Sequence, residues 1–321
     1  MRYNFLSLSP LICDKHVQEH TEKLWKIHYQ PLCKQVFFKL MHFLQAYYQK
    51  ILYSRQPSLI RELTKVLATA SKEMIPLSGG FPNPATFPFT KITVETVDGH
   101  SFCLENSHLQ TALQYLPTQG YGPLVQWLNK LQDQMHNPPV DTSLVITNGS
   151  QDGLCKALEM LLEPGDSVVV EEFVYSGTLS IMNPYKPNYL TIKSDEGGMR
   201  PDSLRQVLNS LGKDVKRPKF LYINPTGANP TGTILSEERR KEIYELASEH
   251  DLLILEDDPY YFLQFTGKRP SSFLSIDVEG RVLRFDSFSK VLSSGVRLGF
   301  VTGPQPLVDR IVLHMQVIRI H

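Results

Sequence analysis

Residues 220–258 have the sequence FLYINPTGANPTGTILSEERRKEIYELASEHDLLILEDD, which contains the clearest structural pattern of the chain. Phe220–Ile223 and Leu252–Leu255 are short apolar runs with the length and composition of buried β-strands. Between them, the segment from Glu237 to His250 has a clear helical pattern that begins after Ser236. A strand, a helix and a second strand in this order predict parallel strands joined by a helix.

The same alternation extends over the second half of the chain. It predicts an α/β fold with a mostly parallel seven-stranded sheet covered by helices on both faces. Ligands bind such sheets at the carboxyl ends of the strands, so the polar residues that follow each strand carry the functional information. The predicted strands are Leu144–Thr147, Val168–Glu171, Leu190–Ile192, Phe220–Ile223, Leu252–Leu255, Val282–Phe285 and Val296–Val301.

The first part of the chain is organised differently. Strands over Thr93–Val97 and Phe102–Glu105 are predicted to form a hairpin around Asp98-Gly99. Further helices are expected from Gln56 to about Ala70, around Leu109–Leu116 and around Leu124–Met135. The predicted organisation is an atypical, partly helical N-terminal extension (1–54), an arm with the hairpin (55–105) and a large domain (106–321).

Composition excludes several classes of protein. The 33 basic and 33 acidic residues of the 321 give a net charge of zero, which argues against a nucleic-acid binder and against a polybasic membrane-surface protein. The 41% hydrophobic and 21% charged content is typical of a globular protein and not of a disordered one. No apolar run is long enough to span a membrane. The scattered cysteines indicate neither a disulfide framework nor a CxxC metal site, so a reducing compartment is expected; they are Cys13, Cys33, Cys103 and Cys155.

The N-terminal sequence is a poor match to a targeting peptide. Arg2 is the only arginine before Arg55, and acidic residues interrupt the segment, unlike a mitochondrial transit peptide. A secretory signal fits worse, because no apolar core leads to a small-residue cleavage site.

A glycine- and serine-rich turn follows the first predicted strand of the large domain. Asn148-Gly149-Ser150-Gln151-Asp152-Gly153 opens a helix, and free N–H groups at a helix start form a natural phosphate site. A plain helix-capping turn is the alternative. The segment is neither a GxxxxGK(S/T) loop nor a GxGxxG loop.

Two further strands end in unusual polar loops. Asn224–Gly232 contains Asn-Pro-Thr-Gly twice, which is an odd composition for a simple connector. Glu256-Asp257-Asp258 places three acids at the end of a buried strand, and this is costly unless a positive group meets them. The candidates for that group are Mg²⁺ and a protonated heterocycle.

A lysine follows two hydroxyl residues after the strand Val282–Phe285. Lys290 comes after Ser287 and Ser289, and Arg297 lies seven residues further on. Most lysines are solvated surface groups, but this one is also placed to serve as an amine nucleophile beside a phosphate site.

Together these segments resemble the fold-type I pyridoxal-phosphate aminotransferases of class I/II, and most closely the kynurenine/α-aminoadipate aminotransferases. The resemblance runs from about Arg55 to the end, and the ordered set of motifs is what makes it specific. The matching segments are Pro57-Ser58-Leu59-Ile60-Arg61, Gly79-Gly80-Phe81-Pro82-Asn83-Pro84, Gly149-Ser150-Gln151, Tyr175-Ser176-Gly177-Thr178-Leu179, Asn229-Pro230-Thr231-Gly232, Asp257-Asp258-Pro259-Tyr260-Tyr261-Phe262 and Ser287-Phe288-Ser289-Lys290.

The resemblance implies a role for each residue toward pyridoxal 5'-phosphate. Lys290 would bond the cofactor aldehyde and then move the proton of the substrate. Asp257 would pair with the pyridine nitrogen, Asn229 and Tyr260 would hydrogen-bond the phenolic oxygen, and Tyr175 would stack on the ring. The phosphate would be held by Ser150, Gln151, Ser287, Ser289 and Arg297.

The substrate side is implied less completely. Arg61 and Gly80 would close over the substrate side chain, with Tyr175 and Asn229 also close to it, and Tyr115 would reach the site of the second subunit of a homodimer. Relatives continue beyond His321 into a small C-terminal domain that supplies an arginine for the substrate carboxylate. We therefore expect that domain to be missing here, and activity to be impaired.

The predicted function is transfer of an amino group from kynurenine, 2-aminoadipate or a similar amino acid to a 2-oxo acid such as 2-oxoglutarate. By resemblance the compartment is the mitochondrial matrix, with the cytoplasm as the alternative. Alternatives of other kinds are a weak or inactive cofactor-binding, dimerising isoform and another pyridoxal-phosphate reaction such as a β-lyase.

Metal-dependent chemistry has little support in the sequence. A hydrolase using Asp257 and Asp258 would need further ligands at other strand ends, and none are found. His16-Val17-Gln18-Glu19-His20 fits the HxxEH zinc pattern without any supporting context, so a solvated helix is the favoured interpretation and no metal is predicted.

Overall fold

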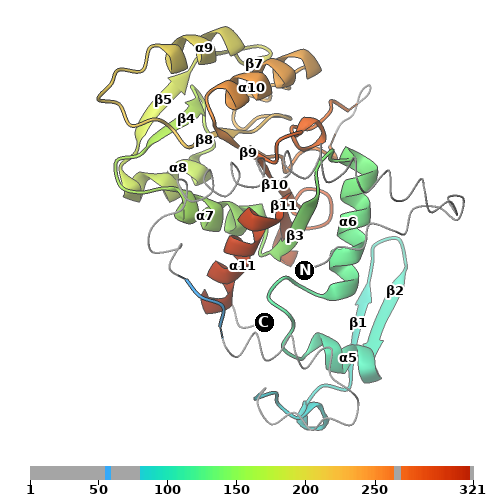
Figure 1. Ribbon diagram of the computed structural model, residues 1–321. Coiled ribbons are helices and arrows are strands. Elements are labelled where there is room, and N and C mark those ends of the chain that lie inside the picture. The colour runs from blue at the N-terminus through green and yellow to red at the C-terminus, as the bar shows by residue number, and fades with distance from the viewer. Residues whose placement is uncertain (1–54, 59–79, 264–268, 319–321) are drawn as a thin grey trace, which may run out of the picture. The chain divides into compact units, whose positions relative to one another are not determined.

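A seven-stranded sheet forms the centre of the computed structural model, in which residues 55–58, 80–263 and 269–318 are described (Figure 1). The strand order is β3-β11-β10-β9-β8-β4-β5. Only β11 runs antiparallel to its neighbours β3 and β10, and the remaining pairings are parallel. The predicted mostly parallel seven-stranded sheet is thus confirmed. The strands are β3 (Thr142–Thr147), β4 (Ser167–Glu171), β5 (Asn188–Ile192), β8 (Phe220–Ile223), β9 (Leu253–Asp257), β10 (Val282–Ser287) and β11 (Gly299–Pro304).

The central strands are buried along their whole length. Every residue of β4, β8, β9, β10 and β11 is buried, which explains the apolar runs without alternation in β4, β8 and β9. Strands of this kind need cover on both faces, so the sheet depends on the helices that pack against it.

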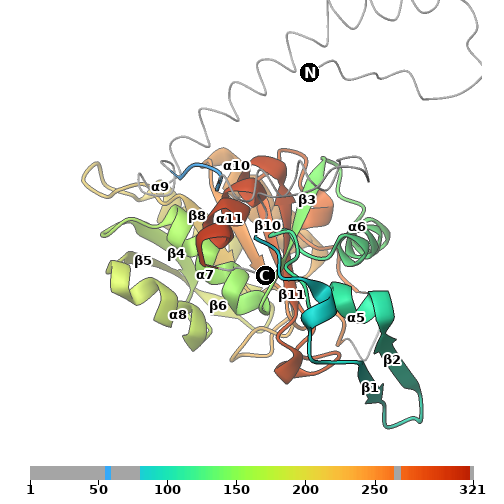
Figure 2. The ribbon, with the colours of Figure 1, turned by 90° about the horizontal axis from the view of Figure 1, so that it is seen from below.

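Helices cover the two faces of the sheet (Figure 2). On one face, apolar residues that are paired in register from β4 to β10 join a single core with α9 and α10. On the other face, α7 packs against β3, β10 and β11, and α11 packs against α7, β3 and β11. The helices are α5 (Asn106–Ala112), α6 (Gly122–His136), α7 (Ser150–Leu161), α8 (Ser176–Met182), α9 (Pro201–Asn209), α10 (Glu237–Glu249) and α11 (Gln305–Ile318).

The smaller elements lie mostly in the connections. The predicted hairpin is confirmed as β1 (Lys91–Glu95) and β2 (Ser101–Glu105), all of whose residues are exposed. A second short pair consists of β6 (Ser194–Asp195) and β7 (Gly198–Met199). Single 3-10 turns are η2 (Pro84–Thr86), η3 (Asn183–Tyr185), η4 (Leu274–Ile276) and η5 (Ser294–Val296).

One predicted strand begins three residues too early. The pattern predicts a strand over Val296–Val301, but Ser294–Val296 is a 3-10 turn and β11 begins at Gly299. Arg297 has a left-handed backbone with φ of 54°. Its guanidinium donates hydrogen bonds to the carbonyls of Ser294 and Asn148, so the chain turns toward the start of α7 before the strand begins.

Helix boundaries also differ slightly from the predicted ones. The pattern around Leu109–Leu116 corresponds to a helix that ends at Ala112, and α6 is longer at both ends than the predicted Leu124–Met135. The predicted extension over residues 1–54, most of the helix from Gln56 and the HxxEH segment lie outside the described residues. Among the helices that are described, none is long and apolar enough to cross a membrane.

Candidate functional site

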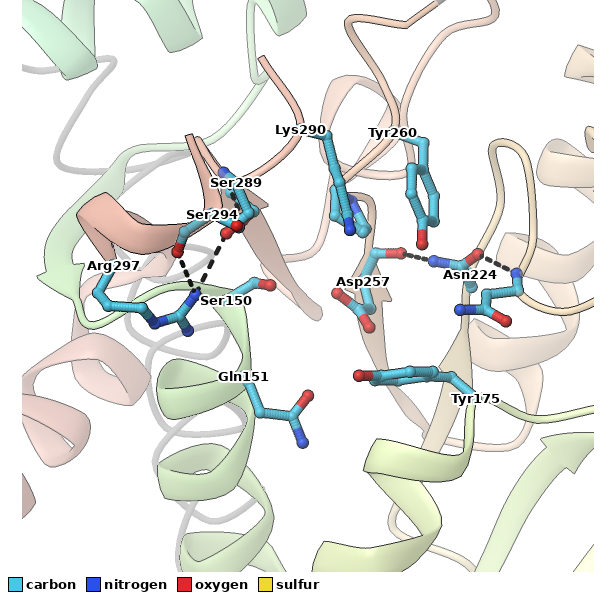
Figure 3. A pocket seen from close by; sticks show the side chains of 13 residues that line it. Ser150, Gln151, Tyr175, Asn224, Asp257, Tyr260, Ser289, Lys290, Ser294 and Arg297 are labelled. Carbon is cyan, nitrogen blue, oxygen red and sulfur yellow. Dashed lines mark hydrogen bonds between the residues drawn. The ribbon is translucent and has the colours of Figure 1, made fainter. Parts of the chain in front are cut away.

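A cavity of about 230 Å³ opens at the carboxyl ends of the strands (Figure 3). Its lining comes from the segments that follow β3, β4, β8, β9 and β10, which is the position expected for a ligand site in such a sheet. The lining residues are Ser150, Gln151, Tyr175, Asn224, Asn229, Asp257, Pro259, Tyr260, Ser287, Ser289, Lys290, Ser294 and Arg297.

One side of the cavity is built to receive an anion. It combines the start of α7, where no side chain caps the first N–H groups, with the guanidinium of Arg297. That guanidinium donates hydrogen bonds to Ser289 Oγ at 3.3 Å and to Asn148 O at 3.0 Å, which hold it beside the helix start. Four serines line the same cavity: Ser150, Ser287, Ser289 and Ser294.

Two glycines make this anion side possible. Gly149 precedes α7 with φ of 80°, and a Cβ there would collide with the Arg297 guanidinium. A Cβ on Gly299 would lie 2.6 Å from the backbone nitrogen of Ser150, so β11 approaches the helix start only because it begins with glycine.

A buried carboxyl group forms another wall. Asp257 ends β9, and the hydroxyl of Tyr222 on β8 donates a hydrogen bond to Asp257 Oδ2 at 2.7 Å. Burial raises the pKa of Asp257 to about 6, although the Tyr222 hydrogen bond opposes this shift. An anionic Asp257 therefore needs a positive partner on its cavity side.

An amine faces the same space. Lys290 is exposed and lines the cavity, with its Nζ 5.9 Å from the centre of the Tyr260 ring. Figure 3 shows Lys290 and Tyr260 side by side, with Tyr175 on the opposite side of Asp257. A planar ligand between Lys290 and Tyr175 would thus have the amine, an aromatic ring and the carboxyl group within one site.

Two acids of the run Glu256-Asp257-Asp258 meet a buried arginine. Arg284 on β10 is completely buried; its Nη1 lies 3.1 Å from Glu256 Oε1 and 3.2 Å from Asp258 Oδ2. It also binds Asp286 through two hydrogen bonds of 3.1 and 3.0 Å. Burial raises the pKa of Asp258 to about 7 despite the charge of Arg284. Only Asp257 of the three acids lines the cavity.

The remaining site residues predicted from the sequence are Tyr115, Gly80 and Arg61. Tyr115 and Gly80 are exposed and do not line the cavity within this chain, and Arg61 lies outside the described residues. Over the described ranges 55–58, 80–263 and 269–318, no three His, Cys, Asp or Glu side chains are grouped to hold a metal ion. Cavity residues that the sequence reasoning missed are Asn224, Pro259 and Ser294, together with Tyr222 behind Asp257.

A sequence signal existed for part of this missed group. Asn224 directly follows the strand Phe220–Ile223, and its amide donates a hydrogen bond to the backbone oxygen of Asp257 at 2.6 Å. Its own Oδ1 accepts from the backbone N–H of Asn229 at 3.0 Å. Position at a strand end would have identified Asn224, whereas Tyr222 lies inside a buried strand, where no such signal exists.

The fold and the site define a known class of protein. The profile of the class I and II aminotransferases matches residues 72–318, and the chain belongs to this family. It is 47% identical over 282 residues to the mitochondrial kynurenine/alpha-aminoadipate aminotransferase of Bos taurus and 46% identical to that of Rattus norvegicus. These alignments cover 84% of this chain and 66% of each relative, so the chain spans slightly less than two thirds of the relatives' length.

Solved structures give the same result for the fold. The aminotransferase Aro8 of Candida albicans is similar with a TM-score of 0.78 and 31% identity, over 84% of this chain and 65% of that one. The kynurenine aminotransferase of Pyrococcus horikoshii, solved in complex with PMP, KYN and KYA, has a TM-score of 0.65 and 33% identity. That comparison covers 88% of this chain and 68% of the other.

Proposed function

We propose that the cavity binds pyridoxal 5'-phosphate and that the protein transfers an amino group from an α-amino acid to a 2-oxo acid. The observation that carries this proposal is the joint presence in one cavity of an amine, a buried carboxyl group and an anion site, supplied by Lys290, Asp257 and Arg297. The similarity to kynurenine/alpha-aminoadipate aminotransferases supports kynurenine or 2-aminoadipate as the amino donor and 2-oxoglutarate as the acceptor.

The residues present fit the cofactor. Its phosphate matches the uncapped start of α7 and the Arg297 guanidinium, which can approach this helix start because Gly149 has no side chain. Its ring nitrogen, when protonated, would be a positive partner for the Asp257 carboxylate on the cavity side. When bound, the cofactor supplies an aldehyde that reacts with amines and a ring that accepts electrons from the substrate Cα.

The chain's own residues then have distinct tasks. Lys290 is the cavity amine that would hold the cofactor through its aldehyde group and, when free, would accept the proton of the substrate Cα. Asn229 and Tyr260 orient the ring through its phenolic oxygen, and Tyr175 covers one ring face. The serine hydroxyls and Gln151 complete the phosphate contacts. Arg61 and Gly80 act on the substrate side.

We further propose that the protein works as a homodimer in the mitochondrial matrix. Tyr115 lies outside the cavity of its own chain, is 43% exposed, and has the ring of Phe81 6.4 Å away. One face of the hairpin exposes Ile92, Val94, Phe102 and Leu104. An apolar surface of this kind is typical of a contact with another chain. Sedimentation of the purified protein as a monomer would contradict the dimer.

The mitochondrial names of the bovine and rat relatives support the proposed compartment. A fluorescent fusion that remains outside mitochondria would contradict it.

The cofactor is tested by chemical trapping. The purified protein, incubated with pyridoxal phosphate and reduced with borohydride, should carry the phosphopyridoxyl mass on the peptide that contains Lys290. Lys290→Ala should abolish this label. Lys213→Ala, which removes an exposed lysine that does not line the cavity, should retain it. Labelling spread over several lysines, or none on Lys290, would overturn the cofactor assignment.

The reaction is tested separately with the same proteins. Kynurenine or 2-aminoadipate with 2-oxoglutarate should give glutamate at a rate above that of Lys290→Ala. A protein that is labelled on Lys290 but transfers no amino group to any 2-oxo acid would retain the cofactor and refute the transfer reaction.

A further inference from the structure

Strand β8 holds Asp257 of the neighbouring strand at two points. Tyr222 is in register with Leu255, two residues before Asp257, so the Tyr222 and Asp257 side chains emerge on the same face of the sheet. The Tyr222 hydroxyl donates to Asp257 Oδ2 at 2.7 Å, and Asn224 Nδ2 donates to the Asp257 backbone oxygen at 2.6 Å. The first contact acts on the reactive carboxyl group, and the second fixes the backbone.

The Tyr222 hydroxyl is a permanent donor. Only 3% of the residue is exposed. Burial and the charge of Asp257 raise the pKa of Tyr222 well above its ordinary value, so the hydroxyl keeps its proton. A neutral buried phenol beside a carboxylate stabilises the ionised form of that carboxylate.

Other charged groups near Asp257 do not replace this contact. On β10, the charge of Asp286 raises the pKa of Asp257 and the charge of Arg284 lowers it. On β4, the charge of Glu171 acts on Tyr222 and raises its pKa. Arg284 directs its hydrogen bonds to Asp258 and Asp286. In the described part of the chain, Tyr222 is therefore the one hydrogen-bond donor to the Asp257 carboxyl group.

We propose that Tyr222 is a positioning residue that keeps the Asp257 carboxylate ionised and oriented toward the ring nitrogen of the cofactor. The inference rests on the proposed cofactor. Without the hydroxyl, the buried carboxyl group favours its neutral form, and a neutral acid does not stabilise a protonated ring nitrogen. The effect of Tyr222 on the ligand thus depends on the ring nitrogen and on Asp257.

The test compares two ligands in binding assays that need no turnover. One is pyridoxal phosphate, and the other is its analogue in which carbon replaces the ring nitrogen. We expect Tyr222→Phe to weaken binding of pyridoxal phosphate about tenfold, the effect of losing one hydrogen bond to a charged group, and to change binding of the analogue less than twofold. Equal losses for both ligands would show a merely structural role and overturn the inference.

A matched control is available in the same chain. Tyr244 is another buried tyrosine whose hydroxyl donates to an aspartate, with a distance of 3.0 Å to Asp277 Oδ1, and neither residue lines the cavity. Tyr244→Phe should leave the affinity for both ligands unchanged. If the wild-type protein binds neither ligand, the proposed cofactor fails, whereas the equal-loss result leaves that proposal intact.

A double substitution provides a second test. Asp257→Asn removes the charge that Tyr222 stabilises, so adding Tyr222→Phe to it should cost less than a further twofold in affinity for pyridoxal phosphate. A further tenfold loss in the double variant would mean that Tyr222 acts independently of Asp257 and would also overturn the inference.

Discussion

Arg297 combines an unusual backbone with a central position in the anion site. Its left-handed conformation returns the chain toward α7, and its guanidinium is held by the Ser294 and Asn148 carbonyls and by the Ser289 hydroxyl. A guanidinium has enough donors to make these contacts and still bind a phosphate, whereas a lysine ammonium does not.

We therefore expect Arg297→Lys to weaken binding of pyridoxal phosphate about tenfold, because a bidentate phosphate contact and the contacts that orient it are lost together. Equilibrium dialysis measures the affinity directly. Arg200→Lys is the matched control, since Arg200 pairs with Asp202 on the surface away from the cavity. An unchanged affinity in Arg297→Lys would show that the helix start alone holds the phosphate.

At the scale of single residues, the sequence predicted the side chains that follow strands but not those inside them. Lys290, Asp257, Tyr260 and Ser150 follow predicted strands, and all of them line the cavity. Arg284 could not be predicted, because in a strand buried on both faces the polar position follows no alternation. The sequence therefore predicts a metal ion or a heterocycle as the partner of the acidic run, and does not indicate the arginine that pairs with Glu256 and Asp258.

At the scale of elements, the position of α7 depends on a close approach to the sheet. Gly153 lies in the first turns of α7, and a Cβ there would be 2.5 Å from Val301 Cγ2 and 3.3 Å from Thr147 Cγ2. The start of this helix forms the anion site, so its distance from β11 and β3 determines where the phosphate contacts lie.

We expect Gly153→Ala to lower the free energy of unfolding by up to about 2 kcal/mol. Overpacking against a buried strand costs about 1–3 kcal/mol, and the better helix propensity of alanine offsets up to about 1 kcal/mol. Gly122→Ala is the control, because Gly122 begins α6 and a Cβ there would have no other atom within 4 Å, so this substitution should be neutral or stabilising. Urea unfolding measures both. A stabilised Gly153→Ala would show that α7 moves away from the sheet at little cost.

Element types could be predicted better than element ends. The strand Phe220–Ile223 and the helix that begins after Ser236 agree with their predictions, because apolar runs and a helix start are local signals. The predicted start of β11 was wrong, because the turn at Arg297 depends on its contact with Asn148, about 150 positions earlier in the chain.

At the scale of the whole molecule, burial of Asp257 makes stability depend on pH. Its pKa is raised from 3.8 to about 6 in the folded state, so the folded protein binds this proton more tightly than the unfolded chain does. Its contribution to stability is fully present below about pH 4 and is lost as the pH rises through about 6.

We compare the free energy of unfolding of the wild type with that of Asp257→Asn, both without cofactor. The difference, wild type minus variant, should fall between about pH 4 and pH 7. The other buried carboxyl groups titrate in both proteins, so their contributions largely cancel in the difference. Urea titrations at several pH values measure these quantities, and a difference that rises with pH would contradict the assignment of the buried proton.

Whole-sheet order was not available from the sequence. The pattern predicts seven strands and mostly parallel pairing, but the order β3-β11-β10-β9-β8-β4-β5 depends on contacts between distant segments. No local signal marks β11 as the strand that inserts between β3 and β10 in the opposite direction.

That order has a consequence for how the protein emerges from the ribosome. Strand β3 pairs with β11 alone in the described sheet, and the two are roughly 150 residues apart. A nascent chain that has completed β3 through β10 still presents an apolar strand without its neighbour, and such unpaired edges promote aggregation. Synthesis of Gly299–Pro304 both closes the sheet and brings Arg297 to the start of α7. The phosphate site is therefore complete only after Gly299–Pro304 has joined the sheet.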